Sequence, residues 1–247
     1  MIKIENVSTA GWEPAIRGAR NPMNSWEKSD SLFVDYVTAI GDDCVCHDIL
    51  NNNHRIVISD WTNKASFNDV LIGPNDLKLL TNLAKSGSDE AKFRRMIVVY
   101  VDVTAPMYWW KEADTYKVGT VRNSCSTMHK IHAKEFTLED FSTEHLETLA
   151  RFDEDGEMHK PYMVLKVVID CLNACRNSYL QTKDKTDWWQ MIQLLPSSYN
   201  QRATLMLNYE VLANMYHARK NHKLDEWKDF CSWIESLPYA KELIIGD

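Results

Sequence analysis

The sequence has little glycine, proline or cysteine. Eight glycines and seven prolines among 247 residues are too few for a turn-rich β fold, and they favour long helices. Six cysteines are too sparse for a disulfide scaffold. Because the first residues also show no signal-peptide pattern, we expect reduced thiols and a cytoplasmic location. No run of about 18 apolar residues occurs, so the sequence predicts no membrane-spanning helix.

Positive charge is also scarce, while large aromatic side chains are abundant. Lysine and arginine total 28 against 35 aspartates and glutamates, which gives a net charge of −7. This balance argues against general binding to nucleic acid or to anionic membranes. A small anionic ligand is still compatible with it, because a pocket needs only two or three local cations. Nine tryptophans and ten tyrosines predict a large core or buried subunit interfaces.

Several common binding motifs are missing. The sequence contains neither of the glycine-rich phosphate loops nor the G-x-S-x-G turn of a serine nucleophile. The cluster of Cys44, Cys46, His47 and His54 lacks the spacing of a zinc site, so we predict no metal. Cys171 and Cys175 lie four residues apart on a predicted helix, which favours a core stripe over a redox pair. A bound nucleotide would therefore be held by side chains and helix ends.

Apolar periodicity predicts strands in the first half of the chain and helices in the second. The strands are expected at 1–10, 56–58 and 96–103. The helices are expected at 74–86, 137–152, 161–182, 184–195, 204–219 and 225–237. No repeat and no linker is evident, so one α+β domain with a central mixed sheet packed with long helices is the predicted architecture.

Two segments have the composition of a binding site. The first follows the strand at 96–103 and includes Lys117, Arg122, Asn123, Ser124 and Ser126. Ligands often lie at loops after strands, and these cations, hydroxyls and amide suit a phosphate or a heterocycle. A capped helix start is the simpler alternative for this segment.

The second segment runs from 195 to 222 and includes Asn208, Asn214, Arg219 and His222. If 204–219 is one helix, Asn208 and Arg219 are eleven residues apart and share a face within about 20°. Polar groups on an apolar stripe are costly to bury unpaired, so this face is expected to line a pocket or an interface. The alternative is an arginine that reaches solvent and an asparagine paired with backbone.

Together the two segments resemble the flavin-dependent thymidylate synthases. In that family a Leu-Pro pair is followed by an Asn twelve residues after the proline, a second Asn six later and an Arg five after that. The same spacing joins Pro196, Asn208, Asn214 and Arg219 here. The family's loop Asn and second Ser fall on Asn123 and Ser126.

This sequence also departs from the family pattern. The family's Arg-His-Arg falls on 115–117, which reads Thr-Tyr-Lys, and its loop Glu is replaced by Ser124. The arginine before Leu-Pro, which grips the substrate phosphate, falls on Ile192, and another falls on Glu210. Lys117, Arg122 and Lys130 are the cations available to replace the missing ones.

The resemblance implies a single domain over 1–247, with insertions near 31–73 and 137–187. It implies a homotetramer that uses FAD, NADPH and methylene-tetrahydrofolate to methylate C5 of a pyrimidine nucleotide such as dUMP. Arg219 would be catalytic and hold the uracil edge, because its fixed fork offers two donors to an oxygen that gains charge. Its substrate-binding partners would be Arg122, Asn123, Ser124 and Ser126. The cofactor-binding residues would be Lys117, Asn208, Asn214 and His222.

Two further hypotheses stay open at this point. One is a member of the same fold that binds a nucleotide or a protein partner without flavin chemistry. The loss of Arg-His-Arg favours it, as do the pairs Trp109-Trp110 and Trp188-Trp189, which we expect to be exposed. The other is a structural oligomer with no small-molecule site.

Overall fold

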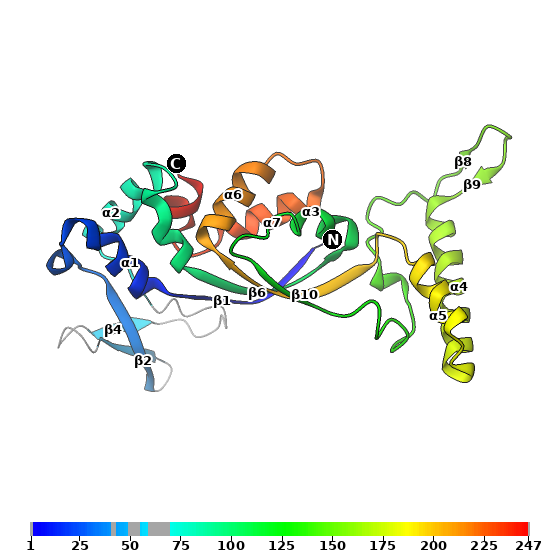
Figure 1. Ribbon diagram of the computed structural model, residues 1–247, viewed down its shortest axis with the longest axis horizontal. Helices are drawn as coiled ribbons and strands as arrows, with labels where there is room; N and C mark the ends of the chain where they lie inside the picture. Colours follow the sequence, from blue (N-terminus) through cyan, green and yellow to red (C-terminus); the bar gives the residue numbers. More distant parts are fainter. Residues whose placement is uncertain (1, 41–42, 49–54, 59–69, 247) are drawn as a thin grey trace. The chain divides into compact units, whose positions relative to one another are not determined.

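The computed structural model describes residues 2–40, 43–48, 55–58 and 70–246 (Figure 1). Its helices are α1 (Trp12–Arg20), α2 (Pro74–Lys85), α3 (Met107–Ala113), α4 (Pro161–Thr182), α5 (Lys185–Leu194), α6 (Tyr209–Arg219) and α7 (Asp225–Glu235). Its strands are β1 (Lys3–Ala10), β2 (Leu32–Ile40), β3 (Asp43–Asp48), β4 (Arg55–Ile58), β5 (Val70–Leu71), β6 (Val98–Pro106), β7 (Val121–Ser124), β8 (Arg151–Phe152), β9 (Met158–His159) and β10 (Asn200–Asn208). Short helical turns are η1 (Asn21–Met23), η2 (Trp26–Lys28), η3 (Glu90–Met96), η4 (Leu138–Asp140) and η5 (Lys241–Ile245).

The central sheet has four strands in the order β1-β6-β10-β7, and Figure 1 labels the first three of them. Strands β6 and β10 run antiparallel, because Tyr209 N–H donates to Ile97 O at one end and Met107 N–H donates to Tyr199 O at the other. Strand β1, which lies at an edge of this sheet, confirms the strand predicted at 1–10. A second sheet joins β4, β3, β2 and β5, and β8 pairs with β9. Sheets and helices together confirm the predicted α+β class.

Alternation along the two inner strands shows why these residues form a sheet. In β6 the side chains of Val99, Val101 and Val103 are buried, and in β10 those of Leu205 and Leu207 are buried. Successive side chains on a strand point to opposite faces, so a period of two in burial means that one face covers the core.

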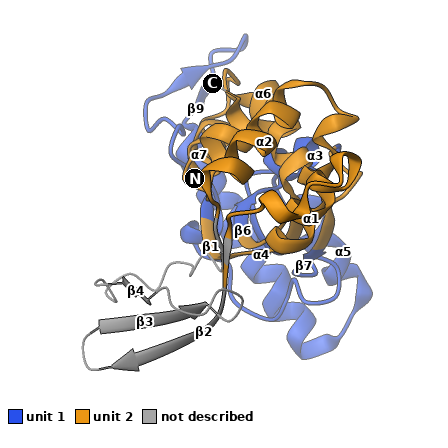
Figure 2. Cartoon of the chain, turned by 90° about the vertical axis from the view of Figure 1, so that its left-hand side faces the viewer, with its two compact units in different colours: residues 1–3, 103–115, 123–204 blue, residues 4–102, 116–122, 205–247 orange. Residues whose placement is uncertain are grey.

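Two compact units share the chain in alternation (Figure 2). Unit 1 comprises residues 1–3, 103–115 and 123–204, and its α4 and α5 enclose a cluster of Ile131, Phe136, Phe141, Leu165, Ile169, Leu172 and Met191. Unit 2 comprises residues 4–102, 116–122 and 205–247, and its largest fully buried side chains include Ile16, Leu80, Tyr209, Leu212, Trp227 and Phe230. A single domain with insertions near 31–73 and 137–187 stays a prediction.

Helix ends with clear sequence signals were predicted correctly. Helix α2 begins at Pro74, whose ring suits the first helical position. Helix α5 follows Asp184, whose carboxylate accepts the N–H of Thr186 at 2.8 Å. Helix α4 also has the predicted bounds, and α7 ends at Glu235, two residues before the predicted end.

The predicted helix at 137–152 is wrong. Thr137 and Asp140 do form the capping box at its start, but only the single turn η4 follows. Phe141 instead pairs with Tyr199 in a β-bridge, and Ser142 N–H donates to Ser198 O at 2.8 Å. Tertiary pairing with the segment before β10 therefore outweighs the local helix signal.

The predicted helix at 204–219 is also wrong in its first part. Strand β10 continues to Asn208, and α6 begins only at Tyr209. Asn208 has extended backbone angles and lies outside the helix, so the predicted common helix face of Asn208 and Arg219 does not exist.

The four paired tryptophans were predicted to be exposed, and two of them are not. Trp109 and Trp110 are buried, and the indole N–H of Trp110 donates to Gln201 O at 2.9 Å. Trp189 is 42% exposed and Trp188 is half-buried. In the described ranges, every helix is too short or too polar to cross a membrane.

A buried ion pair joins α1 to the start of α2 in unit 2. Arg20 Nε donates to Asp76 Oδ1 at 2.5 Å, and both side chains are almost fully buried. The second carboxylate oxygen accepts from the hydroxyls of Ser29 and Ser31 and from the backbone N–H groups of Asp30 and Ser31. Burial by itself raises the pKa of Asp76, but the hydrogen bonds from Ser31, Ser29 and Arg20 and the Arg20 charge together hold that pKa below its usual value.

Candidate functional site

A pocket in unit 1 contains one of the residues that the sequence assigned to substrate. It has a volume of about 560 Å³, within the range of small-molecule sites. We call it the Ser126 pocket. Its lining comes from the end of β6, the segment 125–140 and the start of β10, namely Thr104, Cys125, Ser126, Thr127, Lys130, Ile131, Lys134, Phe136, Glu139, Asp140, Tyr199, Asn200, Gln201 and Arg202.

Basic and aromatic side chains share this pocket. Lys134 forms an ion pair with Asp140, and the hydrogen bond with Asp140 raises the pKa of Lys134. The lining holds three basic side chains, Lys130, Lys134 and Arg202, and two acidic ones, Glu139 and Asp140. The pocket therefore keeps an excess of positive charge in a chain whose net charge is −7.

The apolar part of the lining is built from Ile131, Phe136 and Tyr199. Phe136 and Tyr199 pack edge-on with ring centroids 6.3 Å apart. Burial raises the pKa of the Tyr199 phenol, so that ring is neutral at physiological pH. A planar heterocycle with an anionic group matches this combination of aromatic surface and nearby cations.

Two hydrogen bonds hold the segment 125–134, which we call the Ser126 loop, on β10. Cys125 N–H donates to Arg202 O at 2.8 Å, and Gln201 Nε2 donates to Cys125 O at 2.7 Å. Ser126 Oγ accepts the N–H of His129 at 2.9 Å and so caps a turn, but no helix begins here, so the alternative of a capped helix start is wrong. The Ser126 hydroxyl hydrogen is still available as a donor to a ligand.

Asn123 and Ser124 end β7, and both are exposed. They precede the loop and are not among the lining residues of the Ser126 pocket. The structure thus brings together Ser126 and Lys130, but it does not bring Asn123 or Ser124 into the same pocket.

Arg219 has a fixed orientation in unit 2. Its Nε donates to the hydroxyl of Tyr116 at 3.0 Å. The guanidinium carbon lies 4.9 Å from the ring centroid of Trp227 and 5.7 Å from that of Tyr116. Cation–π contacts and one charged hydrogen bond hold the guanidinium plane, so Arg219 loses little freedom when it binds a ligand. Tyr116 occupies the middle position of the family's Arg-His-Arg.

The other residues assigned to the cofactor also lie in unit 2. Asn208 Oδ1 accepts the N–H of Val211 at 2.9 Å and caps α6. His222 Nδ1 accepts the N–H of Leu224 at 3.2 Å. Lys117 and Asn214 are exposed. Arg122, assigned to the substrate, is half-buried in β7 and also lies in unit 2.

Gly119 allows the turn after Lys117 to contact Asn208. Its φ is +77°, and a Cβ at this position would lie 2.5 Å from Asn208 Nδ2. We expect Gly119→Ala to lower the free energy of unfolding by about 2 kcal/mol, from left-handed backbone strain plus a weakened α6 cap. Chemical denaturation measures this change.

Gly156→Ala is the matched control for that substitution. Gly156 has a similar φ of +79°, but a Cβ there meets nothing within 4 Å. Equal losses in the two variants would show that the contact with Asn208 adds nothing.

The sequence contains two groups of side chains that could bind a metal or form a redox pair, and for both it favours a different role. The described residues hold no group of three or more His, Cys, Asp or Glu side chains that could bind a metal. The side chains of Cys44, Cys46, His47 and His54 lie outside the described part of the chain. Cys175 packs against the unit 1 cluster, but Cys171 is exposed, so these two residues do not form one core stripe.

Comparison with solved structures identifies the fold. The crystal structure of flavin-dependent thymidylate synthase ThyX from Helicobacter pylori complexed with FAD and dUMP has a TM-score of 0.58 and 12% sequence identity, over 98% of this chain and 96% of that one. Another crystal structure of Helicobacter pylori ThyX with FAD and dUMP has the same score and identity, over 98% and 95%. This chain has the fold of a flavin-dependent thymidylate synthase. No protein-family model and no curated protein matches it.

The residues assigned to FAD do not fit its diphosphate as a set. Of Lys117, Asn208, Asn214 and His222, only Lys117 carries a fixed positive charge. Asn208 uses its side-chain oxygen to cap α6, and the neighbouring Glu210 adds a carboxylate whose Oε2 is buried without a hydrogen-bond partner among the described residues. A diphosphate needs several donors and cations, which this group does not supply.

The sequence prediction missed most of the Ser126 pocket. Lys134, Phe136, Asp140, Tyr199 and Arg202 were not assigned to a site. The available signal was the apolar spacing of Ala203, Leu205 and Leu207, because a strand with this period of two places Arg202 on the opposite face.

Proposed function

We propose that this chain is a thymidylate synthase-like protein that binds a pyrimidine nucleotide such as dUMP. The supporting observation is the Ser126 pocket, in which a loop hydroxyl, two cations and two aromatic rings line one cavity. Lys130 and Arg202 suit the phosphate, and Phe136 and Tyr199 suit the ring. The two Helicobacter pylori ThyX structures of the same fold hold FAD and dUMP, which is consistent with a pyrimidine nucleotide as the ligand.

Neutralising both cations tests this proposal. We expect Lys130→Gln with Arg202→Gln to raise the Kd for dUMP by about thirtyfold, since two charged contacts to the phosphate are lost. Isothermal titration calorimetry of the full chain gives the Kd.

Lys160→Gln with Lys166→Gln makes the same change in net charge. Both lysines are exposed in unit 1, and neither lines the Ser126 pocket. We expect the control to bind dUMP like the unchanged protein. Equal binding by all three proteins, or no binding by the unchanged protein, contradicts the proposal.

FAD-dependent methylation at C5 of the pyrimidine is a second candidate function. The fixed guanidinium of Arg219 favours it, because a preoriented fork stabilises an oxygen that gains negative charge. Because the residues assigned to FAD do not fit its diphosphate as a set, FAD, NADPH and methylene-tetrahydrofolate belong to this candidate only as what the family resemblance implies. The assembly would be a homotetramer.

Flavin binding separates the two candidates. A ligand at one hundred times its Kd raises the free energy of unfolding by about 2.7 kcal/mol. Purified protein without flavin absorbance, and with no thermal shift on adding FAD, supports nucleotide binding alone. Flavin absorbance together with dTMP formation supports the enzyme.

A further inference from the structure

A second pocket of unit 1 lies on the other side of the Ser126 loop. It has a volume of about 490 Å³ and is lined by Met128, His129, His132, Tyr179, Lys183, Lys185 and Trp188. We call it the Lys183 pocket. It shares no lining residue with the Ser126 pocket. The same loop lines both pockets with different side chains. The Ser126 pocket is lined by those of residues 126, 127, 130, 131 and 134, and the Lys183 pocket by those of residues 128, 129 and 132.

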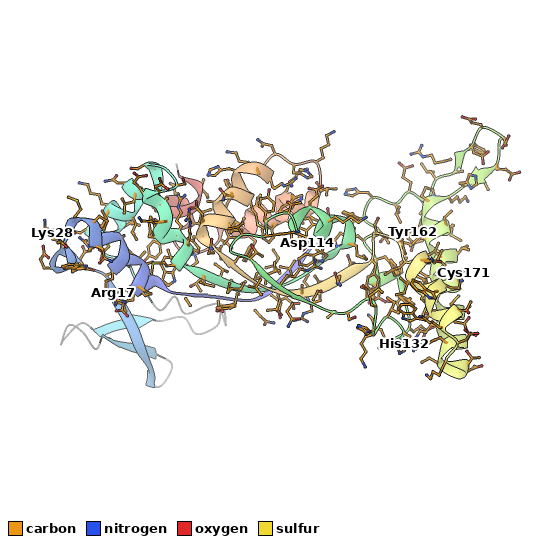
Figure 3. All side chains as sticks on the ribbon, in the orientation of Figure 1. Arg17, Lys28, Asp114, His132, Tyr162 and Cys171 are labelled. Atoms are coloured by element: carbon orange, nitrogen blue, oxygen red, sulfur yellow. The ribbon has the colours of Figure 1, made fainter. Side chains whose placement is uncertain are left out.

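Contacts between the loop and the two helices build this pocket. Trp188 Nε1 donates to Met128 O at 2.9 Å. His132 packs edge-on against Tyr179, with ring centroids 4.9 Å apart, and Figure 3 labels His132 in this part of the molecule. Arg176 Nε donates to His132 O at 3.1 Å. The loop is thereby fixed against α4 and α5 by contacts from both helices.

The charge of the Lys183 pocket favours an anion. Lys183 and Lys185 flank the junction of α4 and α5, and none of the described residues that line the pocket is acidic. The nearest carboxylates in sequence, Asp184 and Asp187, are engaged: Asp184 caps α5, and Asp187 accepts the hydroxyl of Ser178 at 2.6 Å. The N-terminus of α5 is therefore already capped, and the lysines supply the positive charge.

Aromatic side chains and one buried nitrogen indicate a second feature of the ligand, a planar ring. Tyr179 and Trp188 offer ring surfaces, and the Lys183 ammonium lies 5.5 Å from the Tyr179 centroid. His132 Nδ1 is buried without a hydrogen-bond partner among the described residues. A ligand that carries both an anionic group and a planar ring would use all of these groups.

We propose that the Lys183 pocket binds a purine nucleoside monophosphate, with the phosphate at Lys183 and Lys185 and the two-ring base against Trp188 and Tyr179, because a purine offers these two aromatic side chains more stacking surface than a pyrimidine does. The net charge of −7 disfavours a long polyanion, so a small ligand is preferred over nucleic acid. This is a site additional to the proposed dUMP site, and it does not depend on flavin chemistry.

The experiment is calorimetric titration of the full-length chain with AMP and, separately, with inorganic phosphate. We expect Lys183→Gln with Lys185→Gln to weaken AMP binding at least tenfold, and Trp188→Leu to weaken it as well. The double variant Lys160→Gln with Lys166→Gln, of equal charge, should bind AMP like the unchanged protein. Inorganic phosphate should bind at least tenfold more weakly than AMP.

Three outcomes would overturn this assignment: no AMP binding, AMP binding unaffected by the Lys183 and Lys185 substitutions, or equal affinity for AMP and phosphate. The two sites are tested separately. Lys130→Gln with Arg202→Gln should weaken dUMP and leave AMP unchanged, so the failure of either proposal is visible without the other.

Discussion

Replacing Asp76 with alanine is expected to lower the free energy of unfolding by about 3–5 kcal/mol, because the Arg20 guanidinium is left buried without its counter-charge. The hydroxyls of Ser29 and Ser31 also lose their acceptor. For a chain of this size the loss corresponds to a fall in melting temperature of roughly 10 °C. Thermal and chemical denaturation measure it.

Asp76→Asn keeps the shape of the side chain and one acceptor oxygen. This variant replaces Asp76→Ala in the measurement if the alanine variant does not fold. The exposed pair of Glu13 and Arg17 provides the control, since Glu13→Ala should cost less than about 1 kcal/mol. A loss for Asp76→Ala as small as that for Glu13→Ala would refute the structural role of the buried pair.

The lowered pKa of Asp76 also fixes the sign of a pH effect. The carboxylate contributes stability above its unfolded pKa of about 3.9, and that contribution is lost as the pH falls through the lower folded pKa. As the pH falls below about 4, unchanged protein should therefore lose more free energy of unfolding than Asp76→Asn does, because only the unchanged protein carries this carboxylate.

Replacing Arg219 with alanine separates the two candidate functions: the Kd for dUMP is expected to rise about a hundredfold if Arg219 holds the uracil edge, as the family resemblance implies, and to stay unchanged if the Ser126 pocket alone holds the nucleotide. Arg219→Lys keeps the positive charge and part of the stem but loses the planar fork, so it should restore only a small part of the affinity. Calorimetry with dUMP measures both variants.

Stability must be followed in parallel, because Arg219 also packs on Trp227 and Tyr116. Lys220→Ala is a suitable control, since Lys220 is an exposed neighbour that contacts the ring of Tyr216. If Arg219→Ala unfolds like the unchanged protein and still binds dUMP with full affinity, the substrate assignment of Arg219 is wrong.

Elements with strong local signals were predictable from the sequence. Pro74 and Asp184 mark the starts of α2 and α5, and the β-branched run before Pro106 marks β6, because these residues restrict the backbone themselves. The spacing of Pro196, Asn208 and Arg219 also led to the correct fold, although Asn208 lies on no helix.

Elements decided by distant partners were not predictable in this way. Leu205, Met206 and Leu207 have good helix propensity, yet they form a strand because β6 lies alongside. The Thr137 cap is real, but Tyr199, far along the chain, pairs with Phe141 and ends the turn. The same pairing places Tyr199, which lines the Ser126 pocket. Local sequence pattern therefore could not show that Tyr199 belongs to this pocket.

The alternation of the two units along the chain has a consequence for biosynthesis. In unit 2 the ring of Trp12 packs against Tyr209, with centroids 5.3 Å apart, and against Tyr239 at 5.8 Å. At about 5–20 residues per second, Trp12 leaves the ribosome roughly 10–40 s before Tyr209 does. During that interval the apolar face of α1 lacks these two packing partners. Nascent chains that pause before residue 205 are therefore the species most exposed to aggregation and most dependent on chaperones.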